Sequence, residues 1–328
     1  MFRWGIMSTA KIGRAHVNPA IFKSDNGHIT AIASRDLGRA QALAANYSAP
    51  HAFGDYQAML DSDTIDGVYI PLTTDLHVEW AIKAADAGKH VLVEKPLALK
   101  ATDIEPVIAA RDRNNVVVTE AFMVTYHPQW HKVRDLIAEG AIGTLRQVDA
   151  VFSYFNRDPN NMRNRPELGG GVVADIGVYP TIVTRFATGS EPRRVHATLD
   201  HDPDFRIDRY ASVRADFGDF ELSFYISTQL ANRQHIAFHG DKGFIELTCP
   251  FNSNLYEGDE VRLHNAAHNQ VQSWRYTGLD QYQLQVEAFV RAVNGKQSVL
   301  PLEDSVKNQR MLDAIFASAN SGQWFEMS

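Results

Sequence analysis

The sequence predicts an α/β protein that has a doubly wound parallel sheet in its first part and a large, mostly antiparallel sheet in its second. From residue 2 to residue 120, short apolar runs alternate with amphipathic helical segments. Beyond Tyr126 this rhythm gives way to longer segments of strand character that are separated by turn signals. A chain of 328 residues also exceeds one ordinary core. We therefore expect two domains, 1–123 and 124–328.

Five apolar runs in the first part have the length and composition of buried strands. Such runs, separated by amphipathic helices, are typical of a parallel sheet that is covered on both faces. The predicted strands are 2–7, 28–34, 66–70, 90–94 and 116–120, and the predicted helices are 11–22, 37–47, 76–87 and 101–113. This alternation is the pattern of a dinucleotide-binding Rossmann domain.

The second part has the pattern of an antiparallel sheet. Tight turn signals such as Gly218-Asp219 and the loop 240–243 separate its strands. The predicted strands are 146–154, 194–199, 210–217, 221–227, 235–239 and 243–248, and the predicted helices are 130–139, 281–293 and 305–319. One face of such a sheet takes helices and the other can meet a partner subunit. The last helix is also able to pack back on the first domain.

Composition and charge exclude several classes of function. The net charge of −7, with no run of Lys and Arg, argues against binding to nucleic acid or anionic membranes. No apolar run approaches membrane-spanning length and no export signal is apparent, so the expected location is the cytoplasm. The single cysteine, Cys249, lies in an apolar stretch and is expected to be a packed thiol. The 13 histidines lack metal-ligand spacing, so we expect no metal.

The turn after the first predicted strand is a candidate phosphate-binding loop. Where a dinucleotide fold carries G-x-G-x-x-G, this chain has Ser8-x-Ala10-x-x-Gly13. Small side chains there let the backbone approach a pyrophosphate, although Ser and Ala lack the freedom of positive φ that glycine supplies. The expected cofactor contacts are Ser8, Thr9, Ala10, Lys11 and Ile12.

The end of the second predicted strand bears on the choice between NAD and NADP. The chain there reads Ser34-Arg35-Asp36. A basic residue at this point accommodates a 2′-phosphate, whereas a carboxylate holds the ribose hydroxyls of NAD. Asp36 is either the N-cap of the next helix or a ribose ligand. We favour NADP(H) over NAD(H), bound through Ser34 and Arg35.

Lys95 is the first candidate catalytic residue. It follows the buried run 90–94, at the carboxyl end of a parallel strand, where α/β folds bind their ligands. Pro96 restricts the backbone of Lys95 and admits a cis peptide bond. This position favours a role for Lys95 in ligand binding over that of an ordinary solvated side chain.

A second candidate segment follows the three glycines at 169–171. A helix that begins near Val173 would place Asp175 and Tyr179 on one face, four residues apart. A Tyr hydroxyl near a Lys ammonium is a plausible acid/base, because the cation favours the phenolate. The alternative is a glycine turn that is followed by a buried structural helix.

These motifs together resemble the Gfo/Idh/MocA oxidoreductases. The resemblance covers the whole chain, and the blocks AGKHVLVEKP at 87–96 and GGG…DxGxY at 169–179 are highly specific in combination. Further matching segments are 8–13, 73–77, 120–123 and 240–243.

The resemblance implies a role for several residues. Lys95 matches the family's catalytic lysine, and Tyr179 stands where many members have His. The tyrosine is similar to that of the dihydrodiol dehydrogenases, the NADP-linked xylose dehydrogenases and glucose–fructose oxidoreductase. Asp175 would orient the substrate or Lys95. Further cofactor contacts are expected from Leu72, Thr73, Thr74, His77, Glu94 and Lys95, and substrate contacts from Phe122, His127, Arg163, Asp175 and Tyr179. Thr73-Thr74 replaces a common Pro-Asn pair, which puts a nicotinamide-contacting Asn in doubt, and His77 is also suited to fixing its helix.

The predicted function is NADP-dependent hydride transfer to or from a sugar, cyclic polyol or diol. Pyranose C1 oxidation, as of D-xylose, or trans-dihydrodiol oxidation fits the tyrosine variant. A reductase of the 1,5-anhydrofructose type or another carbonyl reductase is an alternative. An alternative of another class is a non-catalytic dinucleotide or sugar sensor. The resemblance further implies a homodimer or homotetramer that forms through the second domain's sheet.

Overall fold

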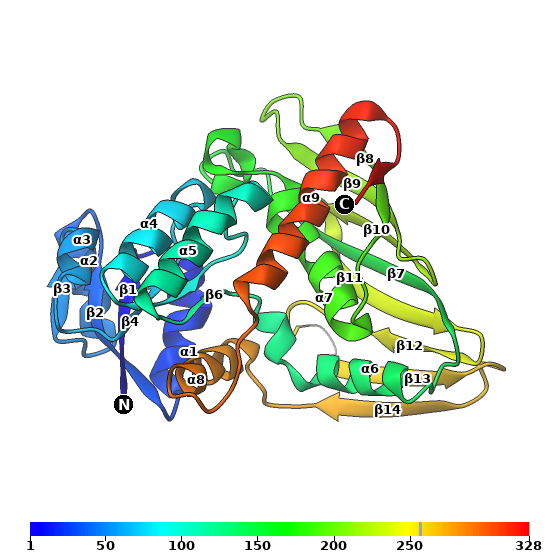
Figure 1. Ribbon diagram of the computed structural model, residues 1–328, viewed down its shortest axis with the longest axis horizontal. Coiled ribbons are helices and arrows are strands. Elements are labelled where there is room, and N and C mark those ends of the chain that lie inside the picture. The colour runs from blue at the N-terminus through cyan, green and yellow to red at the C-terminus, as the bar shows by residue number, and fades with distance from the viewer. Residues whose placement is uncertain (256–257, 328) are drawn as a thin grey trace. The chain divides into compact units, whose positions relative to one another are not determined.

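The computed structural model describes residues 1–255 and 258–327 (Figure 1). The chain divides into two compact units. The first comprises Met1–Met123 and Gln281–Lys307, and the second comprises Val124–Asp280 and the chain from Asn308 onward. A single boundary after residue 123 would assign Gln281–Lys307 to the second unit. Those residues belong to the first because Phe289 and its neighbours pack on Trp4, with ring centroids 5.1 Å apart.

The described part of the first unit holds a parallel sheet of six strands in the order β3-β2-β1-β4-β5-β6. Every neighbouring pair is parallel. The strands are β1 (Phe2–Met7), β2 (Gly27–Ala33), β3 (His51–Phe53), β4 (Gly67–Ile70), β5 (His90–Val93) and β6 (Val118–Glu120). The predicted Rossmann fold is therefore confirmed. The sequence did not predict β3, a three-residue edge strand that is only partly buried and has no apolar periodicity.

Helices cover both faces of this sheet. On one face, α1 (Asn18–Lys23), α2 (Leu37–Asn46) and α8 (Gln281–Val293) bury a core around Trp4, Ile6 and Ile32. On the other, α3 (Tyr56–Leu60), α4 (Thr74–Asp86) and α5 (Glu105–Asn114) pack on Val68, Ile70 and Val91. The start of α9 (Leu302–Ser321) joins this second core through Leu302 and Val306. A 3₁₀ turn, η2 (Ala101–Ile104), forms the start of the predicted helix 101–113.

The described part of the second unit holds a sheet of nine strands in the order β14-β13-β12-β11-β7-β10-β9-β8-β15. The β7–β10 pair is parallel and the other pairs are antiparallel. The strands are β7 (Leu145–Phe155), β8 (Arg194–His201), β9 (Asp208–Asp216), β10 (Glu221–Ser227), β11 (Gln229–Gly240), β12 (Gly243–Leu247), β13 (Asp259–Asn265), β14 (Val271–Tyr276) and β15 (Phe325–Glu326). The mostly antiparallel sheet was predicted, but β13, β14 and β15 were not.

The two faces of the second sheet differ in character. Buried Leu222, Phe224 and Ile226 alternate along β10 with half-exposed Glu221, Ser223 and Tyr225. The apolar face is covered by α6 (Pro128–Ala138), α7 (Val178–Thr188) and the later turns of α9 (Figure 1). The polar face carries no helix in Figure 1. Oligomerisation through this sheet stays a prediction.

A π-helical segment precedes α1 and another precedes α7. Gly13–Val17 leads into Asn18-Pro19, and Val173–Gly177 leads into Val178-Tyr179-Pro180. Proline lacks the N–H of a regular helical turn and clashes with the carbonyl four residues earlier, so a widened turn relieves it. The predicted helix from Val173 therefore starts as a π-helix. Segments of this kind occur often at functional sites.

Replacing Gly67 by Ala should destabilise the first unit. A Cβ at Gly67 would lie 2.6 Å from Cζ of Phe2 and 2.7 Å from the carbonyl oxygen of His90, between β1 and β5. Gly54→Ala is the matched control, because its Cβ meets Leu37 at an ordinary 3.4 Å. In urea unfolding, G67A should lose about 2 kcal/mol or more, and G54A should change by less than about 1 kcal/mol. Equal stabilities would contradict this packing.

Candidate active site

The turn after β1 has the geometry that a phosphate-binding loop requires. Ser8 has a φ of 104°, in the left-handed region that favours glycine. Its Oγ accepts a hydrogen bond from the Ala10 amide at 3.2 Å, which offsets part of that strain. A Cβ at Gly13 would lie 3.3 Å from Oδ1 of Asn18, so the third motif position is tight. Thr9, Lys11 and Ile12 complete the loop and begin the helix.

The end of β2 presents a serine and an arginine. Ser34 is buried, and its Oγ accepts from the Asp36 amide at 3.2 Å. The Asp36 side chain accepts from the Arg39 amide at 3.1 Å, which makes it the N-cap of α2. Arg35 is exposed. Burial raises the pKa of Tyr56, and the nearby Arg35 opposes that shift.

The β4–α4 loop contains the predicted contacts Leu72, Thr73 and Thr74. Thr73 occupies the N-cap position of α4, without a side-chain cap bond, and Thr74 begins the helix and is buried. His77 lies in the first turn with 1% of its surface exposed. Its Nδ1 is 2.8 Å from the carbonyl oxygen of Pro96, and its Nε2 is 3.0 Å from that of Leu72. Burial lowers the pKa of His77.

Lys95 follows β5 directly, and its peptide bond to Pro96 is cis. Glu94 is buried beside Lys95. The Tyr69 hydroxyl donates to its Oε1 at 2.7 Å, and the Lys95 amide donates to its Oε2 at 3.2 Å. From β6, the buried Glu120 accepts a hydrogen bond from the Leu97 amide at 2.9 Å. Burial raises the pKa of Glu120 to about 7, while Lys95 nearby opposes the shift. Lys95 is thus close to a second carboxyl group besides Glu94.

The glycine turn of the second unit is shaped around a buried carboxylate. Gly171 has a φ of 124°, and a Cβ there would lie 2.0 Å from Oδ1 of Asp208. A Cβ on Gly170 would lie 2.7–2.8 Å from three backbone carbonyls. Asp208 accepts from the Val173 amide at 2.7 Å and so caps the start of the helix. Burial raises the pKa of Asp208 to about 6.

Asp175 lies in a polar cluster with Tyr154 and Arg163. The Tyr154 hydroxyl donates to Oδ2 of Asp175 at 2.5 Å, and Nε of Arg163 lies 2.9 Å from the same oxygen. The pKa of Tyr154 is raised, chiefly by burial and then by the charge of Asp175. The pKa of Arg163 is raised chiefly by Asp175.

Tyr179 is buried in an aromatic group near this cluster. Its ring centroid lies 5.6 Å from that of Phe152 and 5.8 Å from that of Phe251, and these two rings stack at 5.1 Å. The charge of Tyr179 contributes to the raised pKa of Tyr154, so Tyr179 and Asp175 are neighbours of the same hydroxyl. The structure therefore brings Asp175, Tyr179 and Arg163 together, and their role in a substrate site stays a prediction.

His127 lies in different surroundings. It has no exposed surface and is the N-cap of α6, accepting from the Gln129 amide at 3.3 Å. Its Nε2 lies 3.3 Å from Oδ2 of Asp259, which is also fully buried. These contacts give His127 a structural role, and its predicted contact with substrate stays a prediction. Phe122 is buried after β6, with 1% exposed.

Several residues of these clusters were missed by sequence reasoning. Tyr154 and Asp208 lie on strands far from the glycine turn, and only the folded sheet brings them to it. Glu120 belongs to the matched segment 120–123. Its position at the C-terminal end of a predicted parallel strand could have marked it as a site residue.

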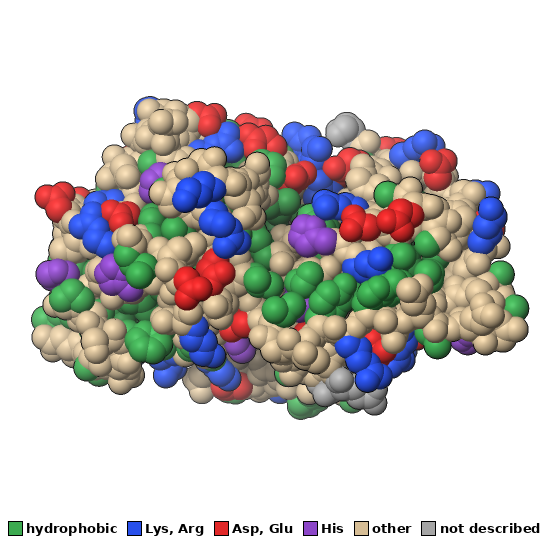
Figure 2. Space-filling view, turned by 90° about the horizontal axis from the view of Figure 1, so that it is seen from below, with side chains coloured by type: hydrophobic (Ala, Val, Ile, Leu, Met, Phe, Trp, Pro, Cys, Tyr) green, Lys and Arg blue, Asp and Glu red, His purple; other side chains and the backbone are tan. Residues whose placement is uncertain are grey.

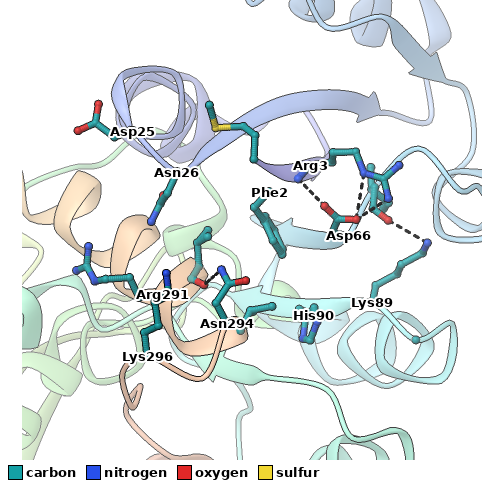
Figure 3. Close-up of a pocket in the computed structure, with 15 residues that line it drawn as sticks. Phe2, Arg3, Asp25, Asn26, Asp66, Lys89, His90, Arg291, Asn294 and Lys296 are labelled. Carbon is teal, nitrogen blue, oxygen red and sulfur yellow. Dashed lines mark hydrogen bonds and ion pairs between the residues drawn. The ribbon is translucent and has the colours of Figure 1, made fainter.

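A cavity of about 740 Å³ lies at the opposite edge of the parallel sheet (Figure 3). It is lined by the amino ends of β1, β4 and β5 and by the end of α8. Two of its basic side chains have partners within the protein. Arg3 pairs with Asp66 at 2.5 Å, and Lys89 donates to the carbonyls of Ser62 and Ile65. Because doubly wound folds bind ligands at the carboxyl ends, we do not assign this cavity to the cofactor.

Other classes of site are not apparent in the described residues. Across 1–255 and 258–327, no cluster of His, Cys, Asp and Glu could hold a metal ion. Within the same ranges, no helix has the length and apolar character needed to cross a membrane. Cys249 is buried, and its pKa is raised to about 11 by burial, which confirms a packed thiol. Charged and apolar side chains are interspersed on the face in Figure 2.

Two family models match successive parts of the chain. One describes an oxidoreductase family with an NAD-binding Rossmann fold and matches residues 2–122. The other describes the GFO/IDH/MocA C-terminal domain and matches residues 130–246. The chain belongs to the Gfo/Idh/MocA oxidoreductase family. The predicted resemblance is confirmed.

Individual Gfo/Idh/MocA relatives match nearly the whole chain. The uncharacterized oxidoreductase ORF334 of Rhizobium meliloti is 40% identical, over 99% of this chain and 98% of its own. The D-xylose 1-dehydrogenase (NADP(+)) 2 of Haloferax volcanii is 35% identical, over 99% of both chains. The crystal structure of KijD10, a 3-ketoreductase from Actinomadura kijaniata in complex with NADP and TDP-benzene, has a TM-score of 0.90 at 28% identity and covers 97% of both chains.

Replacing Glu120 by Gln should stabilise this family member at alkaline pH. Because the folded-state pKa of about 7 lies above the ordinary 4.5, the ionised carboxylate is disfavoured in the fold. The resulting loss of stability is absent below pH 4.5, grows as the pH rises and is complete above pH 7. In urea unfolding, E120Q should gain up to about 3 kcal/mol over the wild type at pH 8. The gain should shrink toward pH 5. A gain of equal size at both pH values would contradict the shift.

Proposed function

We propose that this protein is an NADP(H)-dependent oxidoreductase that acts on a CH–OH group of a sugar, cyclic polyol or diol. The observation that carries the proposal is the placement of Lys95. It leaves β5 at the carboxyl edge of the parallel sheet, next to the buried carboxyl groups of Glu94 and Glu120. Ligands of doubly wound folds bind at that edge. Membership of an oxidoreductase family supports the same reading.

The residues at the carboxyl ends of β1 and β2 fit a dinucleotide. Small side chains and the positive φ of Ser8 leave room for the pyrophosphate against the backbone at Ser8–Ile12. Ser34 and the exposed Arg35 would hold the 2′-phosphate of NADP, since no carboxylate is free there to bind ribose once Asp36 caps α2. Leu72, Thr73 and Thr74 would lie along the nicotinamide end. The NADP-linked xylose dehydrogenase relative agrees with this preference.

We assign proton transfer to Tyr179 and Lys95. In the oxidative direction, the substrate hydroxyl gives its proton to the Tyr179 oxygen, and Lys95 stabilises the phenolate form that accepts it. The C–H bond of the same carbon breaks, and the carbonyl forms. The bound nicotinamide supplies the acceptor for the hydride, which carries both electrons of that bond. Asp175, held by Tyr154 and Arg163, would orient the substrate hydroxyls.

The reverse reaction is the second candidate. KijD10 is a 3-ketoreductase, and the same residues can deliver a proton from Tyr179 to a carbonyl oxygen. A non-catalytic sensor would need neither the Lys95 cluster nor the Tyr179 cluster. We therefore favour catalysis, with sugar oxidation ahead of ketone reduction because of the whole-chain similarity to a D-xylose dehydrogenase.

Tyr179→Phe should lower kcat far more than it lowers cofactor affinity. The substitution keeps the ring that packs on Phe152 and Phe251 but removes the proton-accepting oxygen. Loss of a general base typically costs about 100-fold or more in rate. Steady-state kinetics on an accepted substrate would measure the loss. Tyr210→Phe on β9 removes the same hydroxyl oxygen from another tyrosine and is the control. Near-normal turnover of Y179F would reject the role of Tyr179 in proton transfer.

Arg35→Ala should reduce the preference for NADPH over NADH. Removing the guanidinium should weaken NADPH binding by about tenfold or more, because a charge-assisted contact to phosphate contributes about 1.5–3 kcal/mol. NADH binding should hardly change. Fluorescence titration of both cofactors measures the ratio. Arg39→Ala, on the exposed side of α2, is the matched control. If R35A and R39A gave the same ratio as the wild type, the Arg35 assignment would fail.

A further inference from the structure

The peptide group that follows Pro96 is held at both of its polar atoms by buried ionisable side chains. Its carbonyl oxygen, on Pro96, lies 2.8 Å from Nδ1 of His77. Its N–H, on Leu97, donates to Oε1 of Glu120 at 2.9 Å. Both atoms belong to one planar unit, so the two side chains hold the same rigid group from opposite ends.

The two side chains come from separate elements of the first unit. His77 belongs to the first turn of α4, and Glu120 ends β6, where it pairs in register with Val93 of β5. Their exposed fractions are 1% and 3%, and that of Leu97 is 1%. Water therefore has little access to replace either contact, and losing one would leave a buried polar group unsatisfied.

Burying the carboxyl group of Glu120 is unfavourable for stability. A neutral acceptor would satisfy the Leu97 amide without burying a carboxyl group. Burial instead raises the pKa of Glu120 to about 7 and lowers that of His77. The groups facing Glu120 include Lys95 and Glu94, and those facing His77 include Asp75 and Lys95. Lys95 is common to both sets.

We propose that His77 and Glu120 are positioning residues that fix the Pro96–Leu97 peptide and thereby aim Lys95. The inference rests on the proposed role of Lys95. The ring of Pro96 restricts its own φ, so a fixed peptide after Pro96 leaves the preceding residue little freedom. The other ring nitrogen of His77, Nε2, lies 3.0 Å from the Leu72 carbonyl oxygen in the β4–α4 loop. The neutral imidazole has one N–H, and the tautomer protonated at Nδ1 is the one that donates to the Pro96 carbonyl.

Two substitutions of Glu120 separate contact from charge. Glu120→Gln keeps an oxygen for the Leu97 amide and removes the charge. Glu120→Asp keeps the charge but withdraws the oxygen by one methylene. If positioning is the role, E120D should lower kcat by about tenfold or more, because small misplacements of a catalytic group are costly. E120Q should stay within about threefold of the wild type, and KM for NADPH should change by less than about threefold in both. Thr119 lies on β6 beside Glu120, and its hydroxyl donates a hydrogen bond to the Leu300 carbonyl. Thr119→Val removes that hydrogen bond and is the control for general damage to β6.

Amide hydrogen exchange at Leu97 tests the contact without any turnover. Protection of this amide should fall by about tenfold or more in E120D and should persist in E120Q and T119V. Unchanged protection in E120D would overturn the proposal. Loss of protection in E120Q with protection kept in E120D would also overturn it, because charge and not contact would then matter. If the wild type had no activity on any substrate, the proposed function would fail while this exchange result still decided the contact.

A double-mutant cycle tests whether both residues act on one group. His77→Ala and Glu120→Asp should together cost little more in kcat than the larger single change, since either releases the same peptide. His77→Asn, whose amide nitrogen can still reach the Pro96 carbonyl, should recover much of the loss in H77A. Additive losses in the cycle, with no recovery in H77N, would contradict a shared role.

Discussion

Parallel pairing of β1, β4 and β5 is the constraint on which the proposed chemistry of the first unit depends. It brings the carboxyl ends of these strands to one edge, so Ser8, the β4–α4 loop and Lys95 follow neighbouring strands there. The same pairing places Glu120 of β6 opposite Val93, within reach of the turn after Lys95. The cavity of Figure 3 lies at the amino ends of these strands, at the other edge of the sheet from these groups.

Buried carboxyl groups that hold backbone amides occur in both units. Glu120 binds the Leu97 amide beside Lys95, and Asp208 binds the Val173 amide at the start of the helix that carries Asp175 and Tyr179. Each has its pKa raised by burial, so each carries a free-energy cost when ionised. Proteins accept such costs where a backbone segment must be held in one place. Glu120 and Asp208 each lie at a candidate catalytic segment.

Much of the fold and part of the site could be predicted from the sequence. The strand–helix rhythm gave the parallel sheet, and the position of Lys95 followed from the strand before it. Short or irregular elements could not be seen: β3 has three half-exposed residues, and β13 and β14 lack clear alternation. Tyr154 and Asp208 join Asp175 and Val173 only through long-range sheet pairing, which local patterns do not encode. His127 was predicted to meet substrate, yet its burial against Asp259 depends on a strand 132 residues later, which the motif around it does not reveal.

The central claim is that the chain turns over NADP(H) with a small hydroxylated substrate. A spectrophotometric screen of aldoses, polyols, dihydrodiols and dicarbonyl sugars, with NADP and NADPH in turn, tests it most directly by following the absorbance of the reduced cofactor. The account predicts a change in that absorbance with at least one sugar or diol, and its loss in Y179F. Tight NADPH binding with no turnover across the whole panel would contradict it and would favour a sensor.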